Sequence, residues 1–224
     1  ALREASNGAQ IIADINKKHD IDLQVLNGDD EASMTFLAVR RWLGWSAGKL
    51  LVLDIGGGSL EIASGIDENP EATISLPLGA ARLTNKFLKG DPYTDKSIRS
   101  LRDHVEEKLE QILPNLVKHQ DSDRAIATSK TLRTLARLTG DWFDGNGKNI
   151  TADAIRKLSA KLSEMDNSER AKLPGVSENR ASQIVAGAFV AESVMRNLDI
   201  AELEVCPWAL REGVVLKWLD WMEA

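Results

Sequence analysis

The sequence predicts an α/β domain built around one mixed sheet with helices on both faces. Three apolar runs, 50-LLVLDI-55, 60-LEIAS-64 and 72-ATISLPL-78, follow one another with only short turns between them. That succession is typical of an antiparallel meander. Two further runs, 124-RAIAT-128 and 202-ELEVC-206, each lie between helical patterns. A meander followed by alternating helices and strands favours a mixed sheet that is covered by helices.

The other elements are expected from apolar spacing and from the positions of turn residues. The spacing predicts helices at residues 7–18, 29–43, 80–88, 94–113, 129–138, 151–163, 178–197 and 209–222. Residues 22–28, DLQVLNG, are expected to form a short strand closed by an Asn-Gly turn. Residues 44–49 and 140–149 are rich in glycine and polar residues, and we expect loops there.

The composition indicates a soluble, globular and slightly acidic chain. Of its 224 residues, 43% are hydrophobic, which is enough to bury a core, and the net charge is −6. This balance argues against nucleic acid or an anionic membrane as a partner, although a few placed cations can still bind a small polyanion. The single cysteine, Cys206, excludes an internal disulfide, and neither an apolar run of about 18 residues nor a signal peptide is present. We therefore expect a cytoplasmic protein.

Three consecutive glycines in 51-LVLDIGGGSLEIASG-65 are the main chemical signal from the residues alone. A loop without side chains can direct several main-chain N–H groups at phosphate oxygens. Asp54 and Glu61 flank the loop, and such hard oxygen ligands suit Mg²⁺ or another divalent cation that offsets phosphate charge. The alternative is a glycine-rich hairpin with two solvated acids, and the glycines alone do not decide between the two.

Seven blocks that span almost the whole chain carry a family resemblance. They are 1-ALREASNG-8, 24-QVLNGDDEA-32, 51-LVLDIGGGSLEIASG-65, 75-SLPLGAARLTNKFLKGDP-92, 127-ATSKTLRTLARL-138, 173-LPGVSENRASQIVAGA-188 and 206-CPWALREG-213. In this order they resemble the Ppx/GppA family of exopolyphosphatases and guanosine pentaphosphate phosphohydrolases. The resemblance implies the actin-like, ribonuclease H-like ATPase fold. It makes residues 1–28 a remnant of the first actin-like domain and residues 29–224 the second, with a last helix that can pack back toward the first.

The resemblance also implies roles for particular residues. Glu31, in NGDDEA, matches the glutamate proposed to activate the attacking water, and a carboxylate near a polyanion is suited to act as a general base. Asp54 and Glu61 match the acids at the metal, and Glu61 is also expected to be catalytic. The phosphate-binding residues implied are Arg3, Gly56, Gly57, Gly58 and Ser59. Without the resemblance, Glu31 would be a cap or dipole partner, because it lies with two aspartates at an expected helix start.

Further charged residues match the family less specifically. Four cations lie in or after the LGA and ATSKT segments: Arg82, Lys86, Lys130 and Arg133. They can add positive potential along a polyphosphate path, but exposed helix faces carry such charges in any case. Arg211 and Glu212 match a family motif as well, and we expect them to cap or pair at a helix start.

The chain departs from the family pattern at its beginning. Family members start with a strand that carries an Asp-x-Gly-Ser-Asn phosphate loop facing the DIGGGS loop, and this sequence contains no such motif. We therefore expect that the beginning of a longer protein is absent, and whether the segment is active without it stays open. Leu60, Ala127 and Ser182 also replace residues common in the family, which leaves the finer substrate preference open.

The function predicted from these residues is phosphoanhydride hydrolysis, the release of terminal phosphate from inorganic polyphosphate. Two alternatives stay open: hydrolysis of guanosine pentaphosphate (pppGpp), and a non-catalytic module that binds polyphosphate or an alarmone. The expected partners are polyphosphate or a phosphorylated guanosine nucleotide, with Mg²⁺ or another divalent cation as cofactor. A homodimer is an open option, whereas nucleic acid and a membrane are not expected partners.

Overall fold

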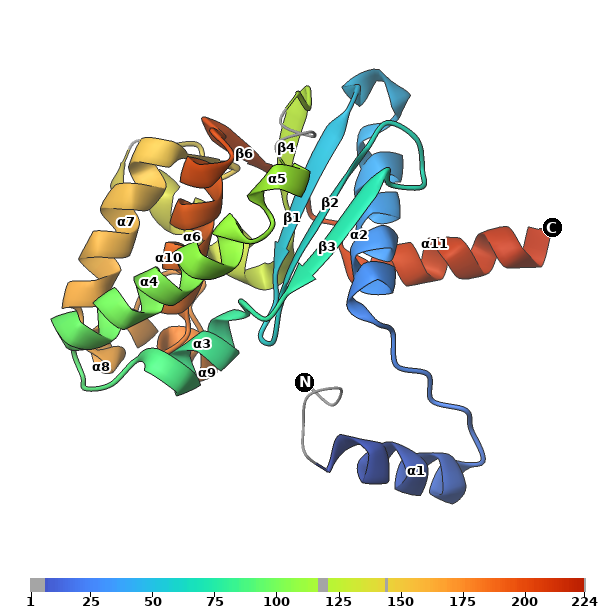
Figure 1. Ribbon diagram of the computed structural model, residues 1–224, viewed down its shortest axis with the longest axis horizontal. Coiled ribbons are helices and arrows are strands. Elements are labelled where there is room, and N and C mark those ends of the chain that lie inside the picture. The colour runs from blue at the N-terminus through green and yellow to red at the C-terminus, as the bar shows by residue number, and fades with distance from the viewer. Residues whose placement is uncertain (1–6, 117–120, 144, 224) are drawn as a thin grey trace.

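A six-stranded mixed sheet forms the centre of the computed structural model, which describes residues 7–116, 121–143 and 145–223 (Figure 1). The strands are β1 (Leu50–Ile55), β2 (Leu60–Gly65), β3 (Ala72–Leu76), β4 (Arg124–Ala127), β5 (Asn149–Thr151) and β6 (Glu202–Val205). Their order across the sheet is β3-β2-β1-β4-β6-β5. Strands β1, β4 and β6 are parallel, while β2, β3 and β5 run antiparallel to their neighbours.

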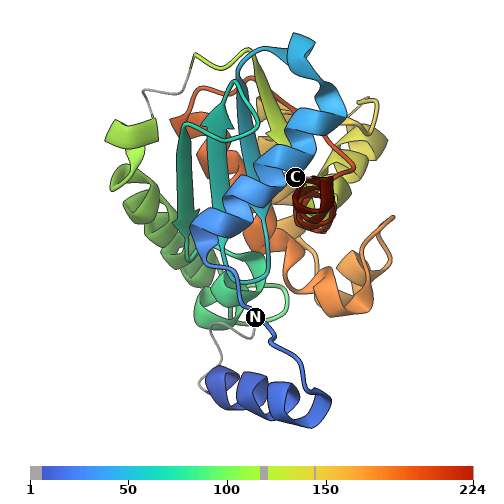
Figure 2. The same cartoon turned by 90° about the vertical axis from the view of Figure 1, so that its right-hand side faces the viewer.

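Helices cover both faces of this sheet. One face is covered by α3 (Ala80–Phe87), α4 (Asp95–Glu110), α6 (Ser129–Trp142), α7 (Ala152–Glu164) and α10 (Ile184–Asn197). Figure 2 shows α2 (Gly28–Leu43) lying across the other face, with α11 (Leu210–Glu223) beside it. The remaining helical segments are α1 (Gly8–His19), the 3-10 turn η2 (Trp45–Ala47), α5 (Leu113–Leu116), α8 (Asn167–Ala171) and α9 (Glu178–Ala181).

Alternation along β1 builds two hydrophobic cores, one on each face. Leu51, Leu53 and Ile55 belong to the larger core under α3, α4, α6, α7 and α10. Leu50 and Val52 belong to the smaller core under α2. Because successive side chains of a strand point to opposite faces, even-numbered positions of β1 face α2. Asp54 therefore lies on the α2 face of the sheet.

The predicted meander is confirmed. Strands β1 and β2 pair antiparallel with Asp54 opposite Glu61, and β2 and β3 pair with Glu61 opposite Ser75. The helices expected at 29–43, 129–138 and 209–222 are present with small changes at their ends. The sheet continues from the meander through the parallel strand β4, as the alternating pattern predicted.

The prediction of a strand at residues 22–28 is wrong. Residues 21–27 form no strand, and Asn27 instead caps α2: its side-chain Oδ1 accepts a hydrogen bond from the Asp30 N–H at 2.9 Å. Asparagine is a preferred helix N-cap, and here that role replaces the Asn-Gly hairpin turn. Ile21, Leu23 and Val25 are left exposed on this extended segment, which joins α1 to α2 (Figure 1).

Two further expectations in the second half of the chain are corrected. The helix expected at 178–197 is interrupted at residues 182–183, where the freed Ser182 carbonyl accepts hydrogen bonds from Tyr93 Oη (2.7 Å) and Thr84 Oγ1 (3.3 Å). The loop expected at 140–149 contains the end of α6 and the start of β5, which pairs antiparallel with β6. In both cases partners distant in the sequence decide the structure.

Helix α11 crosses α2 at a glycine. A Cβ added to Gly213 would lie 1.8 Å from the Met34 carbonyl oxygen, so only glycine allows this close approach. Arg41 of α2 adds an ion pair to Asp220 of α11 (2.7 Å) and another to Glu68. Glu212 accepts a hydrogen bond from the Ala209 N–H, which confirms its expected role at the helix start. Within the described residues, no helix is both long enough and apolar enough to span a membrane.

Candidate active site

Two carboxylates lie side by side at the carboxyl edge of the parallel strands. Asp54 is next to last in β1, and Glu61 is directly opposite it in β2. Ala63 of β2 belongs to the core under α2, so Glu61, two residues earlier, shares that face. The hairpin that joins the two strands contains Gly56, Gly57 and Gly58. The sequence-predicted acids and the glycine loop are therefore brought together by a single β-hairpin.

The amino end of α2 brings a third carboxylate to the same place. Glu31 lies in the first turn of α2 and interacts electrostatically with both Asp54 and Glu61. This turn is docked on β3, because a Cβ added to Gly28 would lie 2.3 Å from Ser75 Cβ, and Thr73 Oγ1 donates to Asp29 Oδ1 at 3.1 Å. The helix cannot slide along the sheet without losing these contacts.

Glu61 has the most altered acidity of the three carboxylates. Glu61 is only 6% exposed, and burial raises the pKa of its carboxyl group to about 7. The hydroxyls of Ser59 and Ser75 hydrogen-bond the carboxylate and oppose this rise, whereas the negative charges of Asp54 and Glu31 add to it. A carboxyl group with such a pKa can exchange protons near neutral pH.

Asp54 is held by a threonine that directly follows the neighbouring strand β4. Burial raises the pKa of Asp54, and the nearby Glu31 raises it further. Two groups lower it in return, the Thr128 hydroxyl, which donates to Asp54 Oδ2 at 2.7 Å, and the positive charge of Arg133. Arg133 is fixed by a hydrogen bond from its Nη1 to the Pro207 carbonyl oxygen at 2.9 Å.

The glycine loop is anchored through its carbonyl groups. The Gly56 oxygen accepts from Ala80 N (2.9 Å), the Gly57 oxygen from Arg82 N (3.0 Å) and the Gly58 oxygen from Arg82 Nε (2.9 Å). All three donors belong to the start of α3. Gly79 permits this contact, since a Cβ there would lie 2.2 Å from the Gly58 carbonyl carbon. The loop is thus seated on the amino end of α3.

The opposite side of the loop presents main-chain N–H groups. Within the described residues, the N–H groups of Gly57, Gly58 and Ser59 have no hydrogen-bond acceptor, whereas Gly56 N donates to Ser59 O. None of these three glycines has a positive φ, and an added Cβ on Gly57 would make only an ordinary contact, 3.7 Å to Ala81 Cβ. The fold therefore does not require a glycine at position 57, and a loop without side chains there would allow a ligand to approach the main chain closely.

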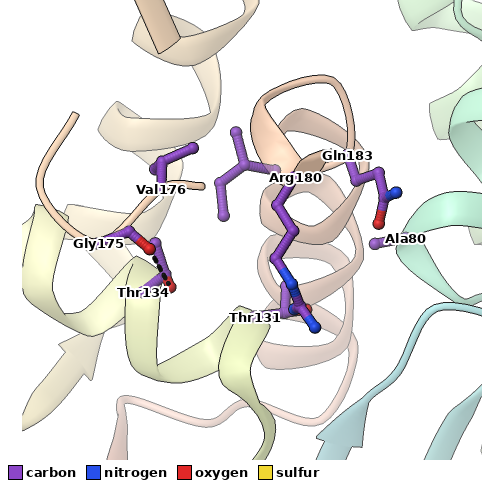
Figure 3. A pocket seen from close by; sticks show the side chains of 8 residues that line it. Ala80, Thr131, Thr134, Gly175, Val176, Arg180 and Gln183 are labelled. Atoms are coloured by element: carbon purple, nitrogen blue, oxygen red, sulfur yellow. Dashed lines mark hydrogen bonds between the residues drawn. The ribbon is translucent and has the colours of Figure 1, made fainter. Parts of the chain in front are cut away.

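A small pocket lies between the start of α3, α6, α9 and the start of α10 (Figure 3). Its lining includes Ala80, Thr131, Arg180 and Gln183, and Thr134 Oγ1 donates to the Gly175 carbonyl at 3.3 Å. The space inside is about 10 Å³. A volume of this order holds about one water molecule. The pocket therefore has no room for a purine base unless its walls move.

The residues present fit a magnesium ion that also binds substrate. No group of three or more His, Cys, Asp or Glu side chains suited to a metal occurs in the part of the chain that the structure describes. Mg²⁺ is commonly held by one or two carboxylates, water and substrate phosphates rather than by a complete protein cage. Asp54 and Glu61 supply two adjacent carboxylates, and burial together with the repulsion of neighbouring carboxylates raises the pKa of both. A divalent cation would relieve that repulsion.

The other residues predicted to contact phosphate lie in different environments, and only some of them are near the carboxylates or the glycine loop. Arg3 lies outside the described residues. Arg82 anchors the glycine loop, and Lys86 Nζ lies 5.0 Å from the centre of the Phe87 ring. Lys130 is exposed at the start of α6. Of these cations, Arg133 is the one whose charge acts on Asp54.

Three residues at the site were missed from the sequence: Thr128, Ser75 and Gly79. Thr128 follows β4 at the same edge as Asp54, and polar residues at the carboxyl ends of parallel strands are a known signal. Ser75 could have been found from the meander, because it is the cross-strand partner of Glu61. The sequence around Gly79 indicated only a turn. A glycine is required there because α3 packs against the glycine loop, and that contact forms only in the folded protein.

Comparison with solved structures identifies the class of fold. The chain aligns over 100% of its length with a Ppx/GppA family member from Aquifex aeolicus, at a TM-score of 0.81 and 25% identity, covering 72% of that chain. It aligns over 98% of its length with an exopolyphosphatase from Cytophaga hutchinsonii, at a TM-score of 0.84 and 25% identity, covering 72% of that chain. The chain is thus an actin-like α/β domain, as expected from its sequence.

The chain belongs to the Ppx/GppA phosphatase family, whose model matches residues 1–222. Proteins named exopolyphosphatase 1 from Mycobacterium tuberculosis and Mycobacterium leprae are 50% and 49% identical to it, in each case over 98% of this chain. The chain spans 65% and 66% of the length of these two relatives.

Proposed function

We propose that the protein containing this chain is an exopolyphosphatase, which hydrolyses the terminal phosphoanhydride bond of inorganic polyphosphate. The observation that carries the proposal is the convergence of Glu31, Asp54 and Glu61, from three elements, beside a glycine loop that presents main-chain N–H groups. Family membership and the names of the mycobacterial relatives support it. We also propose that the protein acts in the cytoplasm, which its acidic composition and single buried cysteine favour.

In this proposal each group has a separate task. The N–H groups of Gly57, Gly58 and Ser59 bind the oxygens of the terminal phosphate. Glu31 accepts a proton from a water molecule, whose oxygen then forms a bond to the terminal phosphorus. The bridging P–O bond breaks, and the shortened polyphosphate leaves with the bonding electron pair. Arg3 is kept as a proposed phosphate ligand.

Asp54 and Glu61 would hold Mg²⁺, which supplies charge neutralisation for the phosphates when it is bound. Thr128 and the two serines keep these carboxylates in place. Glu61 is the proposed catalytic carboxylate on the metal side: it would be ionised when it holds Mg²⁺, and solvent would return a proton to the shortened polyphosphate. Most of the rate enhancement then comes from positioning and electrostatics, as in other phosphoryl transfers.

Polyphosphate ranks above guanosine pentaphosphate in this proposal because the two mycobacterial relatives that match 98% of this chain are named exopolyphosphatase 1.

The test is phosphate release by the full-length protein from long-chain polyphosphate and from pppGpp, at equal concentrations of terminal phosphate and with Mg²⁺. We expect a higher kcat/KM on polyphosphate. Equal values would undo the ranking of the two substrates. Tight binding of polyphosphate without release of phosphate would identify a non-catalytic binding module and contradict the proposal.

A further inference from the structure

Thr128 has an unusual environment for a threonine at the start of a helix. It occupies the N-cap position of the 14-residue helix α6, where a threonine side chain normally accepts a hydrogen bond from the first turn. Here it makes no such cap, although the residue is completely buried. Its Oγ1 instead lies 2.7 Å from Asp54 Oδ2 and 3.2 Å from the Leu53 carbonyl oxygen.

The single hydroxyl proton of Thr128 has one clear acceptor. The Leu53 carbonyl already accepts the Thr128 N–H at 2.9 Å, so it needs no second donor. The carboxylate of Asp54 is the shorter contact and, when ionised, the stronger acceptor. The proton therefore points at Asp54, and the bond fixes both the rotamer and the orientation of that carboxylate.

The following residue takes over the cap that Thr128 gives up. Ser129 has a φ of 64°, in the left-handed region that serine rarely adopts. In this conformation its Oγ accepts a hydrogen bond from Leu132 N at 3.3 Å. A strained backbone beside a carboxylate site is a recognised sign that local geometry serves function.

We infer that Thr128 is a positioning residue that holds the Asp54 carboxylate in the orientation needed to bind a divalent cation. The inference rests on the proposed function, because it assigns Asp54 to the metal. Outer partners of metal ligands commonly change metal affinity or activity by about 10- to 100-fold when they are removed. Thr128 has that relation to Asp54, and it directly follows β4, the strand that is parallel to β1 and adjacent to it.

The experiment compares Thr128→Val, which keeps the shape but removes the hydroxyl, with Thr128→Ser, which keeps the hydroxyl. Mn²⁺ binding to the full-length protein is measured by electron paramagnetic resonance without substrate. In parallel, the Mg²⁺ concentration for half-maximal phosphate release and the KM for polyphosphate are determined. Thr139→Val is the control, because it removes another buried hydroxyl from the far end of α6, where the bond is local.

We expect Thr128→Val to weaken Mn²⁺ binding about 10-fold or more and to raise the Mg²⁺ requirement in parallel, with the KM for polyphosphate little changed at saturating Mg²⁺. Thr128→Ser and Thr139→Val should stay within about twofold of wild type, because both leave the Asp54 hydrogen bond in place. Wild-type Mn²⁺ affinity in Thr128→Val, or equal losses in the Val and Ser variants, would overturn the inference. Failure of the wild-type protein to release phosphate would instead refute the proposed function, since the Mn²⁺ measurement needs no turnover.

Discussion

Glu61 shows how the fold changes the acidity of an ordinary side chain. Its carboxyl group lies inside the sheet edge, and burial outweighs the two serine hydroxyls that favour the ionised form. The same residue on an exposed strand would titrate near its ordinary value of 4.5. The raised pKa also means that ionised Glu61 destabilises the fold at neutral pH.

This cost predicts a pH-dependent gain in stability for Glu61→Gln. The pKa of Glu61 in the folded protein, about 7, lies above its unfolded value near 4.5, so the folded protein binds this proton more tightly. The contribution to the free energy of unfolding is therefore complete below about pH 4.5 and is lost as the pH rises through 7. In urea titrations without divalent cations, the variant should exceed wild type by about 1–3 kcal/mol at pH 8 and match it near pH 4.5.

Glu68→Gln provides a control of opposite sign. Hydrogen bonds from Arg41 hold the pKa of Glu68 low, so the ionised form of that residue is stabilising above its unfolded pKa. The residue is partly exposed, and we expect a loss at pH 8 of no more than about 1 kcal/mol. If Glu61→Gln instead destabilised the protein equally at both pH values, the assigned ionisation of Glu61 would be wrong.

At the scale of elements, the glycine loop and the start of α3 contain one glycine that packing requires and one that it does not. Gly79 is needed for packing, because a Cβ there would collide with the backbone of Gly58 and Ser59. Gly57 is not, because its added Cβ would meet only Ala81 at an ordinary distance. Both glycines belong to one loop contact, but for different physical reasons.

The two alanine substitutions should therefore have different effects. Gly79→Ala should lower the free energy of unfolding by about 3 kcal/mol, since the collision is with backbone that cannot move aside. Gly57→Ala should change stability by less than about 0.5 kcal/mol but reduce phosphate release about tenfold or more, because the methyl group blocks the approach to the N–H groups. Thermal melts and initial rates on the full-length protein check both. Wild-type activity in Gly57→Ala would show that the glycine loop does not bind the substrate.

The elements also show what can be predicted from sequence. The continuous apolar run of β1 and the short turns of the meander were sufficient to place Asp54 and Glu61 together, because both signals are local. The strand expected at 22–28 failed, since Asn27 caps a helix rather than closing a turn. The break at residues 182–183 was not predictable, because Tyr93 and Thr84, far away in the chain, accommodate it. The Thr128–Asp54 bond likewise exists only after β4 pairs with β1.

At the scale of the whole molecule, the two faces of the sheet have separate tasks. The larger core lies under α3, α4, α6, α7 and α10, and the glycine loop is seated on that side. The α2 face has a smaller core and bears the three carboxylates at its edge. The structure thus combines a large rigid support with a site built where α2 meets the sheet. Neither face alone contains the complete arrangement.

The central claim, that Glu31 activates water at this edge, is tested most directly by initial rates of phosphate release from long-chain polyphosphate by the full-length protein. Asp30→Asn is the matched control, since it makes the same change at an exposed position in the same helical turn. We expect Glu31→Gln to reduce kcat by about 100-fold or more, because an amide cannot accept the proton of water, whereas Asp30→Asn should stay within about twofold of wild type. Release by Glu31→Gln as fast as by wild type would contradict the account.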